Sequence, residues 1–159
     1  MNHLDEFTKS ARNFSSWCLT DYGEATTAAR TALSLLIRLY SHALTLQDSD
    51  CVDHDINGEW ADDQTWNTVF KNAGSLPFNY YSTISNPQII PHEGSEVGDI
   101  ADDIADIFRD LSEGLFLYDR GYFAEAEWIF KFYFQAHWGQ HASAAIYALN
   151  CWLMDTGNW

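Results

Sequence analysis

Basic residues are scarce in this sequence. Only 8 of its 159 residues are Lys or Arg, against 23 Asp or Glu, which gives a formal net charge of −15. Proteins bind nucleic acids largely by neutralising phosphates with Lys and Arg, and anionic bilayers attract the same side chains. The charge balance therefore excludes direct binding to DNA, RNA or a membrane surface from the expected functions.

Cysteines and long apolar runs are also few. Cys18, Cys51 and Cys151 are far apart and have no CxxC spacing, so neither a disulfide framework nor a zinc knuckle is expected. No apolar run approaches the ~18 residues that span a bilayer. The first 16 residues carry charges and lack the apolar core of a targeting peptide. These absences together predict a cytoplasmic protein.

Apolar residues are nevertheless plentiful. They make up 47% of the chain, aromatic residues make up 16%, and there are 7 Trp. A disordered acidic tail would contain far less apolar mass, and a chain of this length is long enough to bury one core. We therefore predict a single folded domain over residues 1–159.

The spacing of the apolar residues predicts helices along most of the chain, because they recur every three or four positions. Helices are expected over residues 3–19, 24–46, 63–70, from 99 until Gly121, 123–138 and 140–154. The second is expected to be the central buried helix. Asp62 or Asp63 should cap the third, and Gly74 should end it. Three prolines then indicate an extended connection without a strand pair, in which residues 88–90 are the one candidate for a short strand. The predicted fold class is an all-α, single-domain bundle of about five or six helices.

The helix predicted from Asp99 has an almost purely acidic face. Opposite its apolar side, one arc of the helical wheel carries Asp99, Asp102, Asp103, Asp106, Asp110 and Glu113. Like charges at this spacing destabilise a helix by roughly 0.2–0.5 kcal/mol per pair. Screening by solvent, a bound cation or a docked basic partner would each compensate. The face is therefore a candidate partner-binding surface.

A second acidic stretch lies between residues 47 and 63, within a segment that has no Lys or Arg from Arg38 to Lys71. Its carboxylates accompany Trp60 and Trp66, and such a mixture of charge and large aromatic side chains is typical of interface hot spots. The candidate partner-binding residues here are Asp48, Asp50, Asp53, Asp55, Glu59, Trp60, Asp62 and Asp63.

Two histidines have the spacing of metal ligands. His137 and His141 are four residues apart, which places both on one helical face. Zincins have Glu directly after the first His, whereas Trp138 stands here, and Gly139 separates or kinks the helix between the two. We therefore interpret them as buried histidines bonded to carboxylates of a facing helix, and expect no cofactor and no catalytic residue. If a metal binds, the candidate ligands are Asp102, Asp106, His137 and His141.

Two blocks of the sequence resemble a known family. The run from Val97 to Ile107, VGDIADDIADI, continues as FRDLSEGL and looks like the signature of the bacterial domain of unknown function 5063 family. The aromatic helix that leads into the later HWGQH run, residues 137–141, is similar to that family's second block. The resemblance implies a small all-helical bacterial protein without an established reaction. It also implies a unit formed by Asp102, Asp103, Asp106, Arg109, Asp110, His137 and His141.

No GxSxG, P-loop or GxGxxG motif is present in the sequence. Small acidic helical bacterial proteins without such motifs resemble immunity proteins of contact-dependent growth inhibition or polymorphic toxin systems. The leading hypothesis is a non-enzymatic immunity protein that neutralises a cognate toxin, a basic nuclease, through acidic surfaces with aromatic anchors. One alternative is a metal-dependent helical-bundle hydrolase, such as a phosphohydrolase, and another is an adaptor. The hydrolase would use Asp102, Asp103, Asp106 and Asp110 with His137 and His141.

Overall fold

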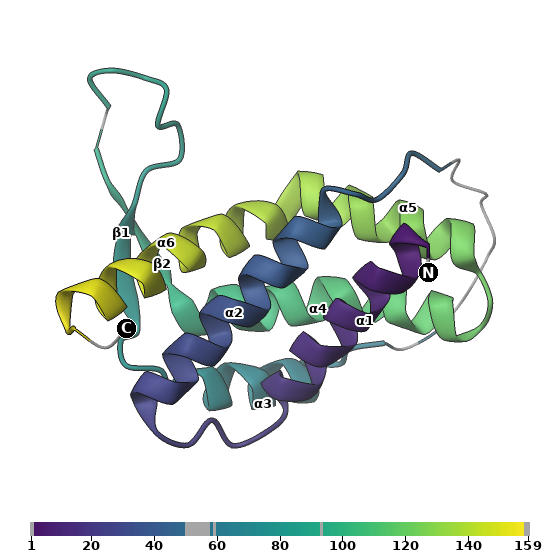
Figure 1. Ribbon diagram of the computed structural model, residues 1–159, viewed down its shortest axis with the longest axis horizontal. Coiled ribbons are helices and arrows are strands. Elements are labelled where there is room, and N and C mark those ends of the chain that lie inside the picture. The colour runs from purple at the N-terminus through teal and green to yellow at the C-terminus, as the bar shows by residue number, and fades with distance from the viewer. Residues whose placement is uncertain (1, 50–57, 59, 93, 158–159) are drawn as a thin grey trace.

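Helices form most of the protein in the computed structural model, which describes residues 2–49, 58, 60–92 and 94–157 (Figure 1). In chain order the elements are α1 (His3–Cys18), α2 (Ala25–Ala43), α3 (Asp63–Ala73), β1 (Tyr80–Thr83), β2 (Glu96–Asp99), α4 (Ile100–Asp119), α5 (Phe123–Tyr133), η1 (Phe134–Trp138) and α6 (Gly139–Asp155). The predicted all-α bundle is confirmed. Among the described residues, each helix is either too short or too polar to span a bilayer.

Helix α4 lies at the centre of the bundle and packs against α1, α3, α5, η1 and α6 (Figure 1). Ile100, Ile104 and Ile107 on α4 are fully buried. The prediction that the helix over residues 24–46 is central was wrong, because α2 packs against α1 and α6 and leaves Ile37 and Leu44 exposed. Apolar content shows that a helix buries one face, but not how many neighbours surround it.

Side-chain caps fix the starts of α2, α3 and α4. Asp62 caps α3 by accepting a hydrogen bond from the backbone N–H of Thr65, and the helix ends at Gly74, as predicted. Glu24 caps α2 in the same way. Asp99 ends β2 and also caps α4, because its side chain accepts from the N–H groups of Ala101 and Asp102. This double role attaches the hairpin directly to the central helix.

Strands β1 and β2 form an antiparallel hairpin, with Tyr80 opposite Asp99 and Thr83 opposite Glu96. The hairpin extends beyond the helices beside α6 (Figure 1). The expectation of no strand pair was wrong, and residues 88–90 are not a strand. Strands of four residues are too short to give a clear alternating pattern. Gly98 makes room for the ring of Tyr81 on the partner strand, since a Cβ at residue 98 would lie 2.4 Å from that ring.

Candidate metal centre

Three carboxylates on the acidic face of α4 are buried. Asp103, Asp106 and Asp110 are only 4%, 9% and 8% exposed. They are spaced by three and four residues, so they share one face of the helix, and α3, η1 and α6 pack against α4. The other members of the predicted acidic arc are half-buried: Asp99, Asp102 and Glu113. The arc is therefore not one continuous solvent-exposed surface, and its buried carboxylates offer little area to a docked partner.

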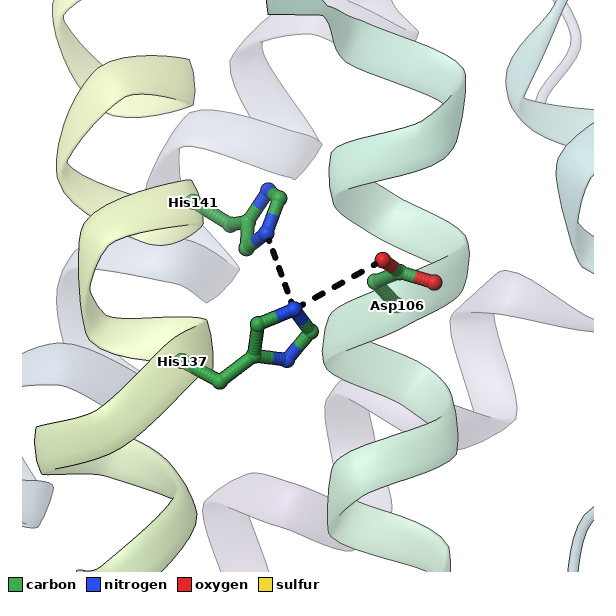
Figure 2. Close-up of side chains that lie close together, drawn as sticks. All are labelled: Asp106, His137 and His141. Atoms are coloured by element: carbon green, nitrogen blue, oxygen red, sulfur yellow. Dashed lines mark hydrogen bonds and ion pairs between the residues drawn. The ribbon is translucent and has the colours of Figure 1, made fainter.

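The histidines that face these carboxylates are positioned by the π-helical turn η1. The backbone N–H of Gly139 donates to the carbonyl of Phe134, five residues earlier. A Cβ at residue 139 would lie 2.4 Å from this carbonyl oxygen, so the close approach requires glycine. The helix thus continues through Gly139, where the sequence suggested a break or a kink. Figure 2 shows His137 and His141 pointing from this helix towards α4. Such π turns occur frequently at functional sites.

A buried carboxylate holds each imidazole ring through its Nδ1 atom. Nδ1 of His137 lies 2.6 Å from Oδ2 of Asp110, and Nδ1 of His141 lies 2.6 Å from Oδ1 of Asp103. The second oxygen of Asp103 accepts a hydrogen bond of 2.5 Å from the Tyr81 hydroxyl. Because an ionised carboxylate only accepts hydrogen bonds, each Nδ1 donates the proton. In a neutral ring, Nε2 is then left with its lone pair free.

Asp106 is fixed through one of its oxygens. Its Oδ1 atom accepts hydrogen bonds from Nε1 of Trp66 at 2.9 Å and from the guanidinium of Arg109 at 2.7 Å. The same guanidinium lies 5.9 Å from the Trp66 ring, within reach of a cation–π interaction. The other oxygen, Oδ2, lies 3.8 Å from Nε2 of His137. Asp106 therefore turns one constrained oxygen towards the histidines.

Asp106, His137 and His141 converge on one point between α4 and the η1–α6 helix (Figure 2). The two Nε2 atoms are 3.2 Å apart, and one ligand atom from each of the three residues lies within 4.8 Å of the others. Ligands bound ~2.0–2.2 Å from one zinc ion are themselves ~3–4 Å apart. Two imidazoles and one carboxylate are also a common ligand set for zinc and iron. The geometry fits a mononuclear transition-metal site.

Burial and nearby charge shift the pKa values around this point. The hydrogen bond that His141 donates to Asp103 raises the pKa of His141, although burial acts against it. Burial raises the pKa of the Asp110 carboxyl more than the bonded His137 lowers it. Asp102 also has a raised pKa, because of burial and then because of the charge of Asp106. The site thus concentrates poorly solvated negative charge beside two imidazoles, an environment that favours a bound cation.

Of the four metal candidates from the sequence, Asp106, His137 and His141 come together, whereas Asp102 lies outside this triad. Apart from Asp102, the unit implied by the family resemblance is also assembled, since Asp103, Asp110 and Arg109 contact members of the triad. Sequence reasoning missed the hydrogen bond that Trp66 donates to Asp106 and the one that the Tyr81 hydroxyl donates to Asp103. These residues belong to α3 and β1, and their types and positions gave no signal of contact with α4.

The acidic stretch before α3 is described only in part. Asp48 is exposed and forms an ion pair of 2.5 Å with Lys131. Trp60 is 36% exposed and packs on the ring of Phe116 at 5.4 Å. Asp62 and Asp63 are exposed at the start of α3, where Asp62 is the cap. The remaining candidates lie outside the described residues: Asp50, Asp53, Asp55 and Glu59.

Comparison with known proteins gives a family and a fold. The family model described as "Domain of unknown function (DUF5063)" matches residues 2–155. The crystal structure of protein BF1032 from Bacteroides fragilis is similar, with a TM-score of 0.78 and 20% sequence identity over 94% of this chain and 90% of that chain. At this identity the likeness concerns the fold alone. No curated protein matches the sequence. The match covers both the α4 carboxylates and the histidines, and the chain belongs to the DUF5063 family.

Proposed function

We propose that the protein is a hydrolase that depends on a divalent transition-metal ion bound by Asp106, His137 and His141. The observation that carries the proposal is the convergence of three ligand atoms, Oδ2 of Asp106 and both Nε2 atoms, which have no other strong partner among the described residues. The opposite side of each group is already engaged. Both Nδ1 atoms face carboxylates, and Oδ1 of Asp106 accepts from Trp66 and Arg109.

A purely structural role for His137 and His141 explains less of this arrangement than a metal site does. Two neutral rings with Nδ1 protonated would point two lone pairs at each other across 3.2 Å, so a cation or a shared proton must lie between them. A shared proton would satisfy His137 and His141 without Asp106. A divalent ion satisfies all three. Carboxylates that hold the Nδ1 atoms of metal-binding histidines orient the rings and raise their basicity, as Asp110 and Asp103 are placed to do.

Hydrolysis is the chemistry that such a centre supports with water alone. Three protein ligands leave coordination positions for water and substrate. The side chains of His137 and His141 are 39% and 26% exposed, so solvent reaches them. A divalent ion held by Asp106, His137 and His141 would supply an activated water and polarise a substrate carbonyl. Net hydrolysis would add the hydroxyl of that water to the acyl carbon and its proton to the leaving nitrogen or oxygen, whose bond to the carbon breaks.

The second candidate function is an immunity protein that docks a toxin through a smaller surface than the sequence suggested. Trp60, of the residue type that dominates interface energetics, is partly exposed close in sequence to the exposed carboxylates Asp62 and Asp63. An inhibitor that docks here should bind a basic toxin domain more slowly after Asp63→Lys, because charge complementarity accelerates association. Asp63 is preferred to Asp62 for this test because Asp62 caps α3. An association rate that Asp63→Lys leaves unchanged would remove this surface from consideration.

Metal titration tests the hydrolase proposal. Protein without a histidine tag is stripped with a chelator, dialysed, and titrated by calorimetry with Zn²⁺, Mn²⁺ or Fe²⁺ in separate runs. We expect one ion per chain. Asp106→Asn and His137→Ala should weaken binding by 100-fold or more, on the order of 3 kcal/mol. The loaded protein is then assayed on a panel of esters and amides, and hydrolysis should stop on addition of chelator.

The matched control is His3→Ala, because His3 is an exposed histidine at the start of α1, outside the triad. This variant should bind the ion as tightly as the unaltered protein does. Equal loss in His3→Ala and His137→Ala would show non-specific binding to an acidic surface. That result, or a chain that takes up no stoichiometric ion, would overturn the proposal.

A further inference from the structure

The proposed metal centre adjoins a groove between the β1–β2 hairpin and α6. A cavity of about 280 Å³ beside His141 is lined by Tyr81 and Thr83 of β1 and by Gln140 and Ala144 of α6. A second cavity of about 540 Å³ shares these four residues and continues along α6 to Tyr147. We call the two cavities together the hairpin groove. Its inner end lies at His141, and its outer end lies at Tyr147, roughly 9 Å further along the helix.

The inner end of the hairpin groove is acidic. Among the described residues that line it, none is Lys or Arg, and four are acidic: Glu96, Asp99, Asp102 and Asp103. Both carboxylate oxygens of Asp103 already accept hydrogen bonds, one from His141 and one from Tyr81. The Asp99 side chain caps α4. One oxygen of Glu96 accepts a hydrogen bond of 2.6 Å from Ser85. The carboxylate of Asp102 accepts no hydrogen bond from any described residue, and its position in the wall leaves it available to a ligand.

The outer end of the hairpin groove has a different character. The described residues that line the second cavity include no Asp, Glu, Lys or Arg. Ile84, Pro87, Ala144 and Tyr147 provide apolar surface, and Ile84 and Tyr147 are 39% and 69% exposed. Exposed apolar side chains beside a cavity are a typical feature of a ligand-binding groove. The groove thus combines a negatively charged end at the triad with an apolar end away from it.

We infer that the centre hydrolyses acyl compounds that carry a protonated amine and an apolar chain, with the ammonium group at Asp102 and the chain in the outer hairpin groove. This inference rests on the proposed hydrolase. An ammonium group gains charge-assisted hydrogen bonds at the inner end, whereas a phosphate or carboxylate group would meet four carboxylates there. Arg109 does not offset this charge, because it is bonded to Asp106 and is not among the residues that line the groove. The groove therefore disfavours an anionic group on the part of the substrate that lies away from the ion.

Binding of three probes with the same chain tests this selectivity. Octylamine, octanoate and octyl phosphate are titrated into the zinc-loaded protein and into the metal-free protein at 150 mM salt, and binding is followed by NMR shifts of groove residues. In the metal-free protein, where the anions cannot coordinate zinc, we expect octylamine to bind at least 10-fold more tightly than either anion. Asp102→Asn should weaken octylamine binding by about 10-fold. Tyr147→Ala should weaken it by removing apolar contact, and ethylamine should bind more weakly than octylamine.

Asp63→Asn is the matched control, since it removes an exposed carboxylate of α3 that does not line the groove. It should leave octylamine binding unchanged and so separate a site at Asp102 from general attraction to a chain of net charge −15. Equal losses in Asp102→Asn and Asp63→Asn would overturn the inference, as would an anion that binds the metal-free protein as tightly as octylamine does. The zinc titration is measured separately, so its failure refutes the hydrolase, whereas normal zinc binding without amine selectivity refutes only the substrate class.

Discussion

The Nε2 atoms of His137 and His141 lie 3.2 Å apart, while the Nδ1 atom of each ring faces a different buried carboxylate of α4. Each ring is therefore fixed at one nitrogen and converges with its neighbour at the other. Fixing the orientation in advance reduces the free-energy cost of ordering the ligands when an ion binds. The metal affinity of the centre should therefore depend on Asp103 and Asp110, which hold the rings, as well as on the triad itself.

Replacing Asp110 by Asn tests this dependence. The amide keeps the size of the carboxyl group but removes the charge that orients His137 and makes it more basic, so zinc affinity should fall by roughly 10- to 100-fold. Competition with a chromophoric chelator measures the change. Glu113→Gln is the control one turn further along α4, because Glu113 is bonded to the Tyr133 hydroxyl at 2.8 Å rather than to a histidine. Equal affinities in the two variants would contradict a role for Asp110 in metal binding.

Local sequence was sufficient to predict α4 and its two faces, because helical periodicity and capping depend on neighbouring residues. The sequence also suggested that the histidines face the carboxylates of α4, but it did not reveal that α3 and β1 contact the same face. Trp66 contacts Asp106 across 40 residues of sequence, and Tyr81 contacts Asp103 across 22 residues. A helical wheel reports which carboxylates share a side of the helix, but not whether solvent or another helix lies against them. Helical periodicity alone therefore presents these buried carboxylates as a docking surface.

The histidine motif was found by its spacing, but its geometry was not predictable from that spacing. A separation of four residues assumes a regular α-helix, whereas the π turn at residues 134–138 inserts an extra residue immediately before Gly139. A π turn leaves little local signature other than the glycine, which was interpreted as a break or a kink. The close packing of Phe134 on Gly139 explains why that glycine is needed.

Gly139→Ala should disturb both stability and the metal site. Alanine favours a helix by about 1 kcal/mol over glycine, but overpacking typically costs 1–3 kcal/mol. The clash is with the backbone oxygen of Phe134, which cannot rotate away, so we expect the cost to exceed the gain. Urea unfolding should report a net loss of stability, and zinc affinity should fall as His137 is displaced. Ser143→Ala, at an exposed position of α6, is the control. A variant at least as stable as the unaltered protein, with normal zinc affinity, would refute this account of the turn.

Glu24 should make stability depend on pH in the acidic range. Its pKa falls from an ordinary 4.5 to about 2, because the backbone N–H groups of Thr26 and Thr27 donate to its carboxylate. A depressed pKa in the folded state means that the ionised cap stabilises the fold fully above pH 4.5 and loses this effect as the pH falls towards 2. Glu24→Gln should thus have a lower urea midpoint than the unaltered protein at pH 7, and the difference should shrink towards pH 3. A difference that grows on acidification would contradict the capping role.

Trp66→Phe isolates the support of Asp106 from the packing of α3. The Trp66 ring stacks on Phe70 at 5.2 Å with an interplanar angle of 18°, and phenylalanine should retain most of this contact. The substitution removes the donor to Oδ1 of Asp106, so that oxygen keeps only the bond from Arg109. Loss of one partly buried hydrogen bond should lower the free energy of unfolding by about 1 kcal/mol. Because the carboxylate is then less constrained, zinc affinity should also fall, by about 10-fold.

Trp128→Phe provides the comparison for this substitution. Trp128 stacks on Phe132 at 5.1 Å with an interplanar angle of 6°, but it lies on α5 and has no described contact with the triad. Its replacement should therefore change zinc affinity little, even if unfolding becomes easier. Calorimetric zinc titrations of both variants, with urea unfolding measured on the same samples, separate the two effects. If Trp66→Phe changes stability but not zinc affinity, the bond to Asp106 supports the fold and does not prepare the carboxylate as a ligand.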